Sequence, residues 1–249
     1  MTTSTALPSR RRSRTRSDSQ NVKPFTQRLA ILLALALSLP LLYGGGCLLL
    51  AGIASYQTQA FLDHWSAKGS EPSPQAWQVA HAAAQRAVDL YPGSNGEYLE
   101  RLGRVLQWQQ FRQPYGAAEA EPSRRAALEA FRAASAARPT WPNNWVALAY
   151  TKLYLRELDD EFAHALKQAQ AFGPNRIDVN RSLADIGLIT WPVLDAQQEQ
   201  DTLEAARRTV AYSQREAQNL LALAESAGMD FELCESLDAA LKDTRKICR

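Results

Sequence analysis

One run of the sequence, Leu29 to Ser55, contains 27 consecutive residues without a charged side chain. A helix rises about 1.5 Å per residue, so a helical run of this length reaches about 40 Å and exceeds the roughly 30 Å hydrocarbon core of a bilayer. No comparable run occurs elsewhere in the sequence. We therefore expect a transmembrane helix over residues 29–55, with a short segment before it and a large one after it.

Three alternatives to a single span are weaker. A cleaved signal peptide has an apolar core of about 7–15 residues and a small-x-small cleavage site. This run is longer, and Ala51–Ser55 matches that site poorly. A lipoprotein signal at Gly44–Cys47 would not be followed by three leucines. A re-entrant hairpin would break at Pro40, but spanning helices tolerate proline and glycine, so one kinked span is simpler.

Charge is distributed unevenly around this run. Residues 1–28 carry seven basic side chains and one acidic one, whereas residues 29–249 carry 21 basic and 25 acidic ones. Because positive charge favours the cytoplasmic side, we expect residues 1–28 to form a cytoplasmic tail and residues 56–249 to lie outside the cytoplasm. The tail has few large apolar side chains, which predicts disorder. The acidic remainder lacks the basic surface of a nucleic-acid binder, so nucleic acid is not an expected partner.

The rest of the sequence predicts an all-α fold. Alanine is abundant after Pro74, and no segment of useful length alternates apolar and polar residues. We expect residues 56–73 to be a juxtamembrane linker that ends in a break at 69–74. Helical repeats would follow over 74–194, and two capping helices, about 197–227 and 231–244, would occupy 195–249.

An internal repeat supports this division. Pro92, Pro139 and Pro174 each follow a helical segment that has alanine five and nine residues earlier. The first two prolines are 47 residues apart and the last two are 35 apart, which places an inserted loop at about residues 113–122. Small residues on one helix face let a neighbouring helix approach closely, and proline ends a helix.

This spacing resembles the tetratricopeptide repeat (TPR), in which each unit is a pair of helices. The resemblance places the small residue of two first helices at Ala149 and Ala184. An irregular helical bundle is the alternative. The predicted repeat core consists of Ala127, Phe131, Ala134, Pro139, Trp145, Leu148, Ala165, Leu166, Ala169 and Pro174.

The chemistry-bearing residues predict no active site. Three histidines, His64, His81 and His164, lie in separate segments without further ligands at metal-binding spacing. Nucleophile motifs and glycine-rich phosphate loops are absent from the sequence, so we expect no enzyme, cofactor or metal. Cys234 and Cys248 could form a disulfide outside the cytoplasm only if the last helix ends near residue 244, because an unbroken helix separates them by about 21 Å.

Three motifs between residues 127 and 188 suggest a more specific relationship: W-P-N-N-W from Trp141 to Trp145, E-L-D-D-E-F from Glu157 to Phe162, and Gly173 followed by Pro174. They resemble the repeat region of VpsP-type exopolysaccharide biosynthesis proteins. The resemblance implies a bitopic protein of the bacterial inner membrane, mostly periplasmic, that serves as a non-catalytic scaffold or assembly factor for polysaccharide synthesis or export proteins. It supplies no catalytic residue.

Two alternatives stay open. One is a helical domain that binds or modifies glycans. Trp141, Trp145 and Trp191 are expected to fill the core, and the alternative is a stacking surface for a sugar or peptide on the concave face of the repeats. The other is a TPR-type adaptor for another envelope machine.

Overall fold

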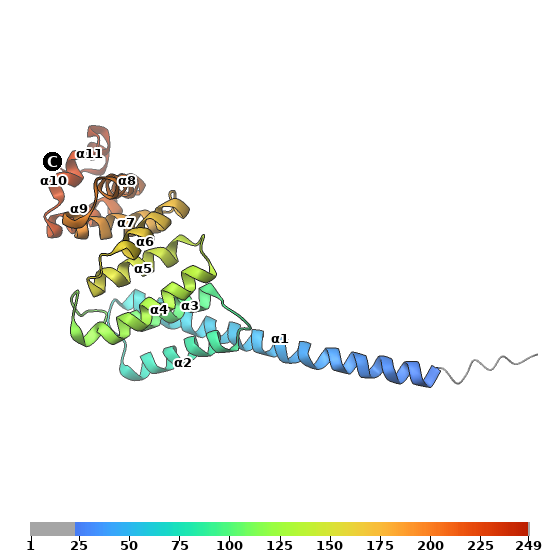
Figure 1. Ribbon diagram of the computed structural model, residues 1–249. Helices are drawn as coiled ribbons and strands as arrows, with labels where there is room; N and C mark the ends of the chain where they lie inside the picture. The colour runs from blue at the N-terminus through green and yellow to red at the C-terminus, as the bar shows by residue number, and fades with distance from the viewer. Residues whose placement is uncertain (1–22, 249) are drawn as a thin grey trace, which may run out of the picture. The chain divides into compact units, whose positions relative to one another are not determined.

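The computed structural model describes residues 23–248 (Figure 1). Most of the predicted disordered tail, residues 1–22, lies outside them. The chain separates into two compact units, Met1–Gly46 and Cys47–Arg249. The described residues contain helices and no strand, which confirms the predicted all-α class. The α-helices are α1 (Lys23–Lys68), α2 (Pro74–Leu90), α3 (Gly96–Trp108), α4 (Glu121–Ala137), α5 (Pro142–Leu155), α6 (Asp160–Phe172), α7 (Ile177–Thr190), α8 (Ala196–Tyr212), α9 (Gln214–Ala227), α10 (Asp230–Glu235) and α11 (Ala239–Arg245).

In the first unit, α1 carries the apolar run. It begins at Lys23, so the last residues of the predicted tail are helical, and Pro40 does not interrupt it. The helix is long and apolar enough to cross a membrane, judged by length and composition, and its most apolar window is not buried within the protein. This makes α1 a candidate membrane span, and the continuous helix contradicts a re-entrant break at Pro40.

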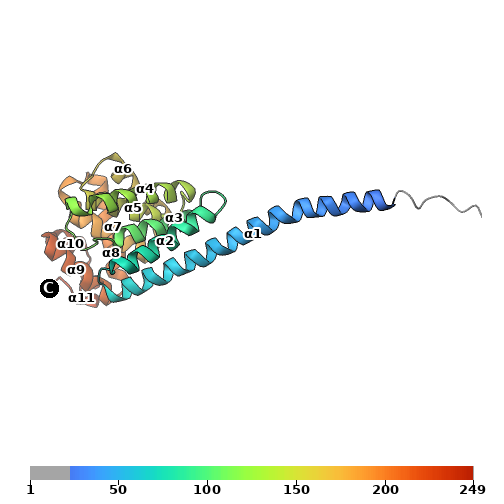
Figure 2. The ribbon, with the colours of Figure 1, turned by 90° about the horizontal axis from the view of Figure 1, so that it is seen from below.

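In the second unit, the end of α1 belongs to the folded core. Leu62 and Trp65 are 0% and 3% exposed, and the Trp65 ring lies 5.9 Å from that of Trp108 on α3. In both views the last part of α1 lies beside α2 and α3 (Figures 1 and 2). The predicted linker over 56–73 was therefore too long. Burial of the apolar side chains keeps residues 56–68 helical, and the connection is residues 69–73.

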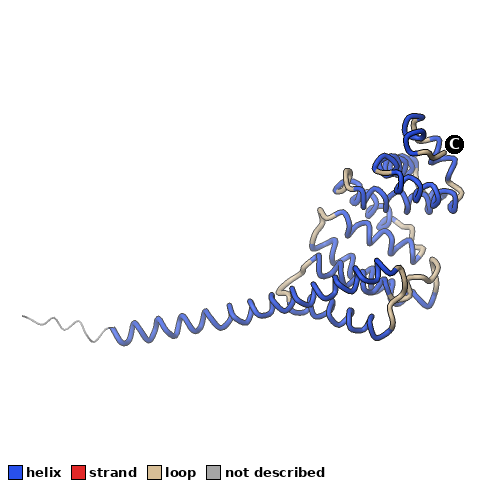
Figure 3. Tube along the Cα trace, turned by 180° about the vertical axis from the view of Figure 1, so that it is seen from behind, coloured by secondary structure: helices blue, strands red, loops and turns tan. Residues whose placement is uncertain are grey.

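The following helices form TPR-like pairs. The pairs α3–α4, α5–α6 and α7–α8 stack in chain order (Figure 1) and are joined by short connections (Figure 3). Within the second unit, the end of α1 and α2 both pack against α3. Pro92, Pro139 and Pro174 each lie two residues beyond the end of α2, α4 or α6. The prolines thus stand where the chain leaves a second helix, as the spacing predicted.

Local side-chain chemistry explains where several helices begin. Asn95 caps α3 by accepting hydrogen bonds from two main-chain amides, and Asp159 caps α6 by accepting from the amide of Phe162. Asp195 and Gln198 form a reciprocal capping box at the start of α8. Such caps satisfy amides that have no acceptor within the first helical turn.

The ten predicted repeat-core residues occupy three environments. Trp145 and Leu166 are partly buried, and Pro139 and Pro174 are exposed. The other six are buried: Ala127, Phe131, Ala134, Leu148, Ala165 and Ala169.

The small first-helix positions Ala149 and Ala184 are both fully buried. The structure adds two glycines that the repeat spacing did not indicate. Gly103 on α3 faces the ring of Phe131, and Gly187 on α7 faces the side chain of Thr202 on α8. These close contacts let each first helix approach its second helix.

The C-terminal segment differs from the prediction. The expected helix over about 197–227 is divided at Ser213, whose hydroxyl caps α9 by accepting from the amide of Glu216. The expected helix over 231–244 is divided by residues 236–238. Helix α8 packs on α7 through Thr202 and Gly187, so the two helices form one pair. The predicted boundary at residue 194, between the repeats and the capping helices, therefore falls within this pair.

Candidate binding groove

A groove of about 560 Å³ crosses the first helices of the three stacked pairs. It is defined by side chains from α3, α5 and α7, whose second helices α4, α6 and α8 complete the pairs behind them. Among the residues that line it are Glu100, Arg104 and Gln107 of α3, Asn143, Ala147, Tyr150 and Tyr154 of α5, and Asp178 and Arg181 of α7.

Both signs of charge line the groove. Arg104 lies 3.7 Å from Glu100, and burial raises the pKa of the Glu100 carboxyl. Asp178 is held by Arg176 at 2.8 Å, and this guanidinium keeps the pKa of Asp178 at about 2. The groove therefore offers fixed positive, negative and amide groups that could bind a polar segment by hydrogen bonding.

Tyr150 connects the groove to a carboxyl group beside it. Its hydroxyl donates to Oδ2 of Asp185 at 3.3 Å. Burial raises the pKa of Asp185 to about 6 and raises that of Tyr150 well above its ordinary value. The pair links α5 to α7 and fixes the Tyr150 side chain, which lines the groove.

A second cavity, which we call the end pocket, adjoins the groove. Its volume is about 150 Å³, and it shares Arg104, Gln107 and Tyr154 with the groove. The remaining lining residues are Trp108, Phe111, Arg124 and Thr151. The groove and the end pocket thus form a connected site.

A buried lysine on α5 stabilises the junction of α4, α5 and α6. Lys152 on α5 is 1% exposed, and its Nζ lies 2.9 Å from Asp159 Oδ2 and 2.7 Å from Glu161 Oε2. Glu161 also accepts hydrogen bonds from Arg132 on α4. Because Asp159 caps α6, the E-L-D-D-E-F motif is explained by its structural role in joining α4, α5 and α6.

The three tryptophans singled out in the sequence do not line the groove or the end pocket. Trp141 lies between the guanidinium groups of Arg138 and Arg176, 4.4 and 4.7 Å from its ring centre. Trp145 donates its indole N–H to the Pro139 carbonyl at 2.7 Å. Their contacts hold consecutive pairs together, so the suggested stacking surface for a glycan does not lie in the groove.

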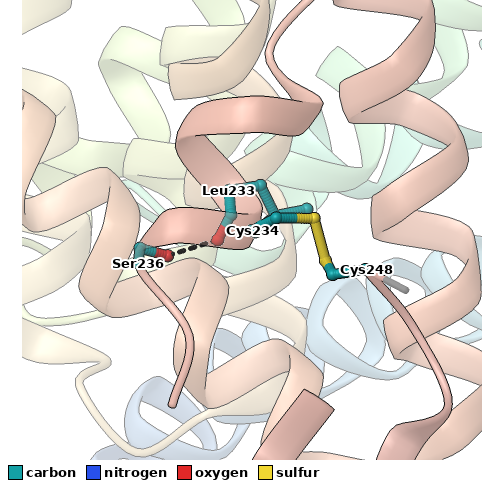
Figure 4. The surroundings of a disulfide bond; sticks show 4 residues. All are labelled: Leu233, Cys234, Ser236 and Cys248. Atoms are coloured by element: carbon teal, nitrogen blue, oxygen red, sulfur yellow. Dashed lines mark hydrogen bonds between the residues drawn. A yellow bond between two sulfur atoms is a disulfide. The ribbon is translucent and has the colours of Figure 1, made fainter. Parts of the chain in front are cut away.

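A disulfide joins Cys234 of α10 to Cys248, with 5.6 Å between their Cα atoms (Figure 4). The chain can turn back because α11 ends at Arg245, and Lys246 and Cys248 both have positive φ. Arg245 donates to the Val210 carbonyl at 3.0 Å and ties this turn to α8. Among residues 23–248 the structure shows no cluster of three or more His, Cys, Asp or Glu side chains that could hold a metal.

No protein-family model matches this sequence. No curated protein matches it. A solved structure with partial similarity is the crystal structure of MamA protein, with a TM-score of 0.45 and 16% identity over 80% of this chain and 98% of that chain. The TPR-like assignment rests on the helix pairs and their packing.

Proposed function

We propose that this protein is a membrane-anchored, non-catalytic scaffold that binds an extended segment of another protein in its groove. The groove is the observation that carries the proposal, because three consecutive first helices present charged, amide and aromatic side chains along one continuous surface. A polar segment could pair with these groups without rearranging the core, since Arg176, Asn143 and Asp185 already hold neighbouring groups in place.

We further propose that the partner is a polysaccharide synthesis or export protein and that the groove faces the periplasm of a bacterial inner membrane. The resemblance of the three sequence motifs to VpsP-type proteins supports the partner class. The uneven charge across the apolar run supports the orientation. The disulfide at Cys234 and Cys248 agrees with an oxidising compartment.

Site-specific cross-linking in living cells tests the groove. A photoreactive phenylalanine analogue replaces Ala147, which lines the groove, and in a control protein it replaces Glu225, which is exposed on α9. We expect a discrete cross-linked partner at position 147 and a different or no product at position 225. Identical products at the two positions, or none at 147, would contradict binding in the groove.

Deletion of the gene tests the biological assignment separately. We expect less surface polysaccharide and recovery by the wild-type gene. We also expect the cross-linked partner to be identified by mass spectrometry as a synthesis or export protein. Unchanged surface polysaccharide in the deletion strain would contradict this assignment. The proposal of a scaffold would then apply to another envelope machine.

A further inference from the structure

The inserted loop between α3 and α4 contributes one wall of the end pocket. Helix α3 ends at Trp108 and α4 begins at Glu121, so Phe111 belongs to the intervening loop. The ring of Phe111 lies 4.5 Å from that of Trp108. The Gly116 amide donates to the Tyr154 carbonyl at 2.8 Å, which fixes the loop against α5. The loop therefore adds an aromatic wall to the end pocket.

Arg124 carries a charge that no acidic side chain of the described residues neutralises. The residue is 5% exposed, and its guanidinium donates only to the carbonyls of Gln113, Pro114 and Tyr154, at 2.6, 2.9 and 3.0 Å. Within the described chain Arg124 forms no ion pair with a carboxylate, and its guanidinium carbon lies 5.0 Å from the centre of the Tyr154 ring. A buried cation without a counter-charge is unfavourable, because hydrogen bonds to neutral carbonyls and a ring contact offset its desolvation only in part.

Arg104 supplies a second guanidinium to the same pocket. Its contact with Glu100, at 3.7 Å, is longer than a charge-assisted hydrogen bond, which spans about 2.7–2.9 Å. The pocket thus combines two arginines with the rings of Trp108, Phe111 and Tyr154. Aromatic walls suit the methylene groups of a side chain, and paired guanidinium groups suit a carboxylate.

We infer that the end pocket receives a carboxylate side chain, aspartate or glutamate, of the segment that the groove binds. This inference rests on the proposed function. The three residues shared by the groove and the end pocket make the path continuous, and a volume of about 150 Å³ accommodates one side chain. The acidic side chain would serve as the anchor that sets the position of the segment in the groove.

The test uses the full-length protein in lipid nanodiscs and a displayed library of random 12-residue peptides. Enriched peptides are synthesised, and their acidic residue is changed to the corresponding amide. We expect the acidic peptide to bind at least tenfold more tightly than its amide form, in line with a hydrogen bond between charged groups. In Arg104→Gln we expect this ratio to fall below threefold. In Arg215→Gln, an exposed arginine on α9, we expect it to be unchanged.

The outcomes separate this inference from the proposed function. If no peptide is enriched, or if Ala147→Arg in the groove does not block binding, the proposed function fails and the inference fails with it. If Ala147→Arg blocks binding but the acidic and amide peptides bind within twofold, only the inference is overturned. A ratio that persists in Arg104→Gln places the carboxylate elsewhere and also overturns it. Binding of an oligomer of an acidic sugar, lost in Arg104→Gln while no peptide competes, overturns the choice of a protein segment.

Discussion

The ring of Phe131 on α4 lies directly against Gly103 on α3. A Cβ atom built on Gly103 would be 2.6 Å from Cε1 of Phe131, a distance that real Cβ atoms essentially never show. Both residues are buried, and a phenylalanine ring has few alternative positions in a packed core. This contact sets how closely α3 and α4 approach, and it places the first helix at one end of the groove.

Gly103→Ala should therefore destabilise the protein. Overpacking a core costs about 1–3 kcal/mol, while alanine gains up to about 1 kcal/mol over glycine in helix propensity, so we expect a net loss of about 1–2 kcal/mol. Urea unfolding of the full-length protein in detergent, followed by circular dichroism, measures the change. Gly52→Ala is the matched control, because a Cβ there meets no atom within 4 Å. A variant at Gly103 that is as stable as wild type would contradict the packing.

Lys152→Met should weaken the junction of α4, α5 and α6. The substitution removes hydrogen bonds from a buried ammonium to Asp159 and Glu161, and each charged hydrogen bond contributes about 1.5–3 kcal/mol. Because both carboxylates are partly exposed and regain water, we expect a total loss of only about 2 kcal/mol. Lys167→Met, at an exposed position on α6, is the control and should change stability by less than about 0.5 kcal/mol.

The same cluster predicts an acid dependence. Arg132 and Lys152 lower the pKa of Glu161 from 4.5 to about 2 in the folded protein. A lowered carboxyl pKa contributes stability above the unfolded pKa, and this contribution is lost as the pH falls through the folded pKa. The difference in stability between wild type and Lys152→Met should hence narrow between about pH 4.5 and pH 2. A difference that stays constant down to pH 2 would show that the ion pairs contribute nothing.

Asp185→Asn should have the opposite pH dependence. Burial raises the pKa of Asp185 from 3.8 to about 6, with Tyr150, Arg181 and Glu216 as the neighbouring groups. The folded state therefore favours the protonated carboxyl, and ionisation above pH 6 costs the folded state at most about 3 kcal/mol. Asparagine cannot ionise and still accepts the Tyr150 hydroxyl. We expect Asp185→Asn to become more stable than wild type as the pH rises from about 4 to 6, and then to keep a constant advantage. Equal stability of the two proteins at pH 8 would refute the raised pKa.

Cys248→Ser should lower the local stability of α10 and α11 and leave the rest of the helices unchanged. A disulfide that closes a loop of about 15 residues stabilises by about 3 kcal/mol in the chain-entropy model. We expect faster amide hydrogen exchange in α10 and α11 and unchanged exchange in α3 to α6, because the bond links only the terminal turn to α10. Cys47→Ser is the control. In protein from cells, maleimide should label only Cys47 until the disulfide is reduced, and labelling of three cysteines without reductant would argue against the bond.

Features that depend on short-range pattern were predictable from the sequence. The uncharged run, the absence of alternating segments and the spacing of Pro92, Pro139 and Pro174 indicated an all-α chain with a candidate span and TPR-like pairs. These signals are local, because helix propensity, helix-ending prolines and small residues on one helix face act over a few turns. The inserted loop was also visible, since one repeat interval is longer than the next.

The site itself was decided by tertiary structure. Leu62 and Trp65 draw the end of α1 into the core, and Ser213 divides a helix whose pattern looked continuous. Arg104 and Arg124 reach one pocket from different helices of a pair, and Lys152 meets carboxylates from the next connection and helix. Such contacts depend on how the helices pack and on which charged side chains that packing buries next to one another. Local sequence patterns predicted the helical class, the candidate span and the paired helices, whereas the packing of the helices created the groove and the end pocket.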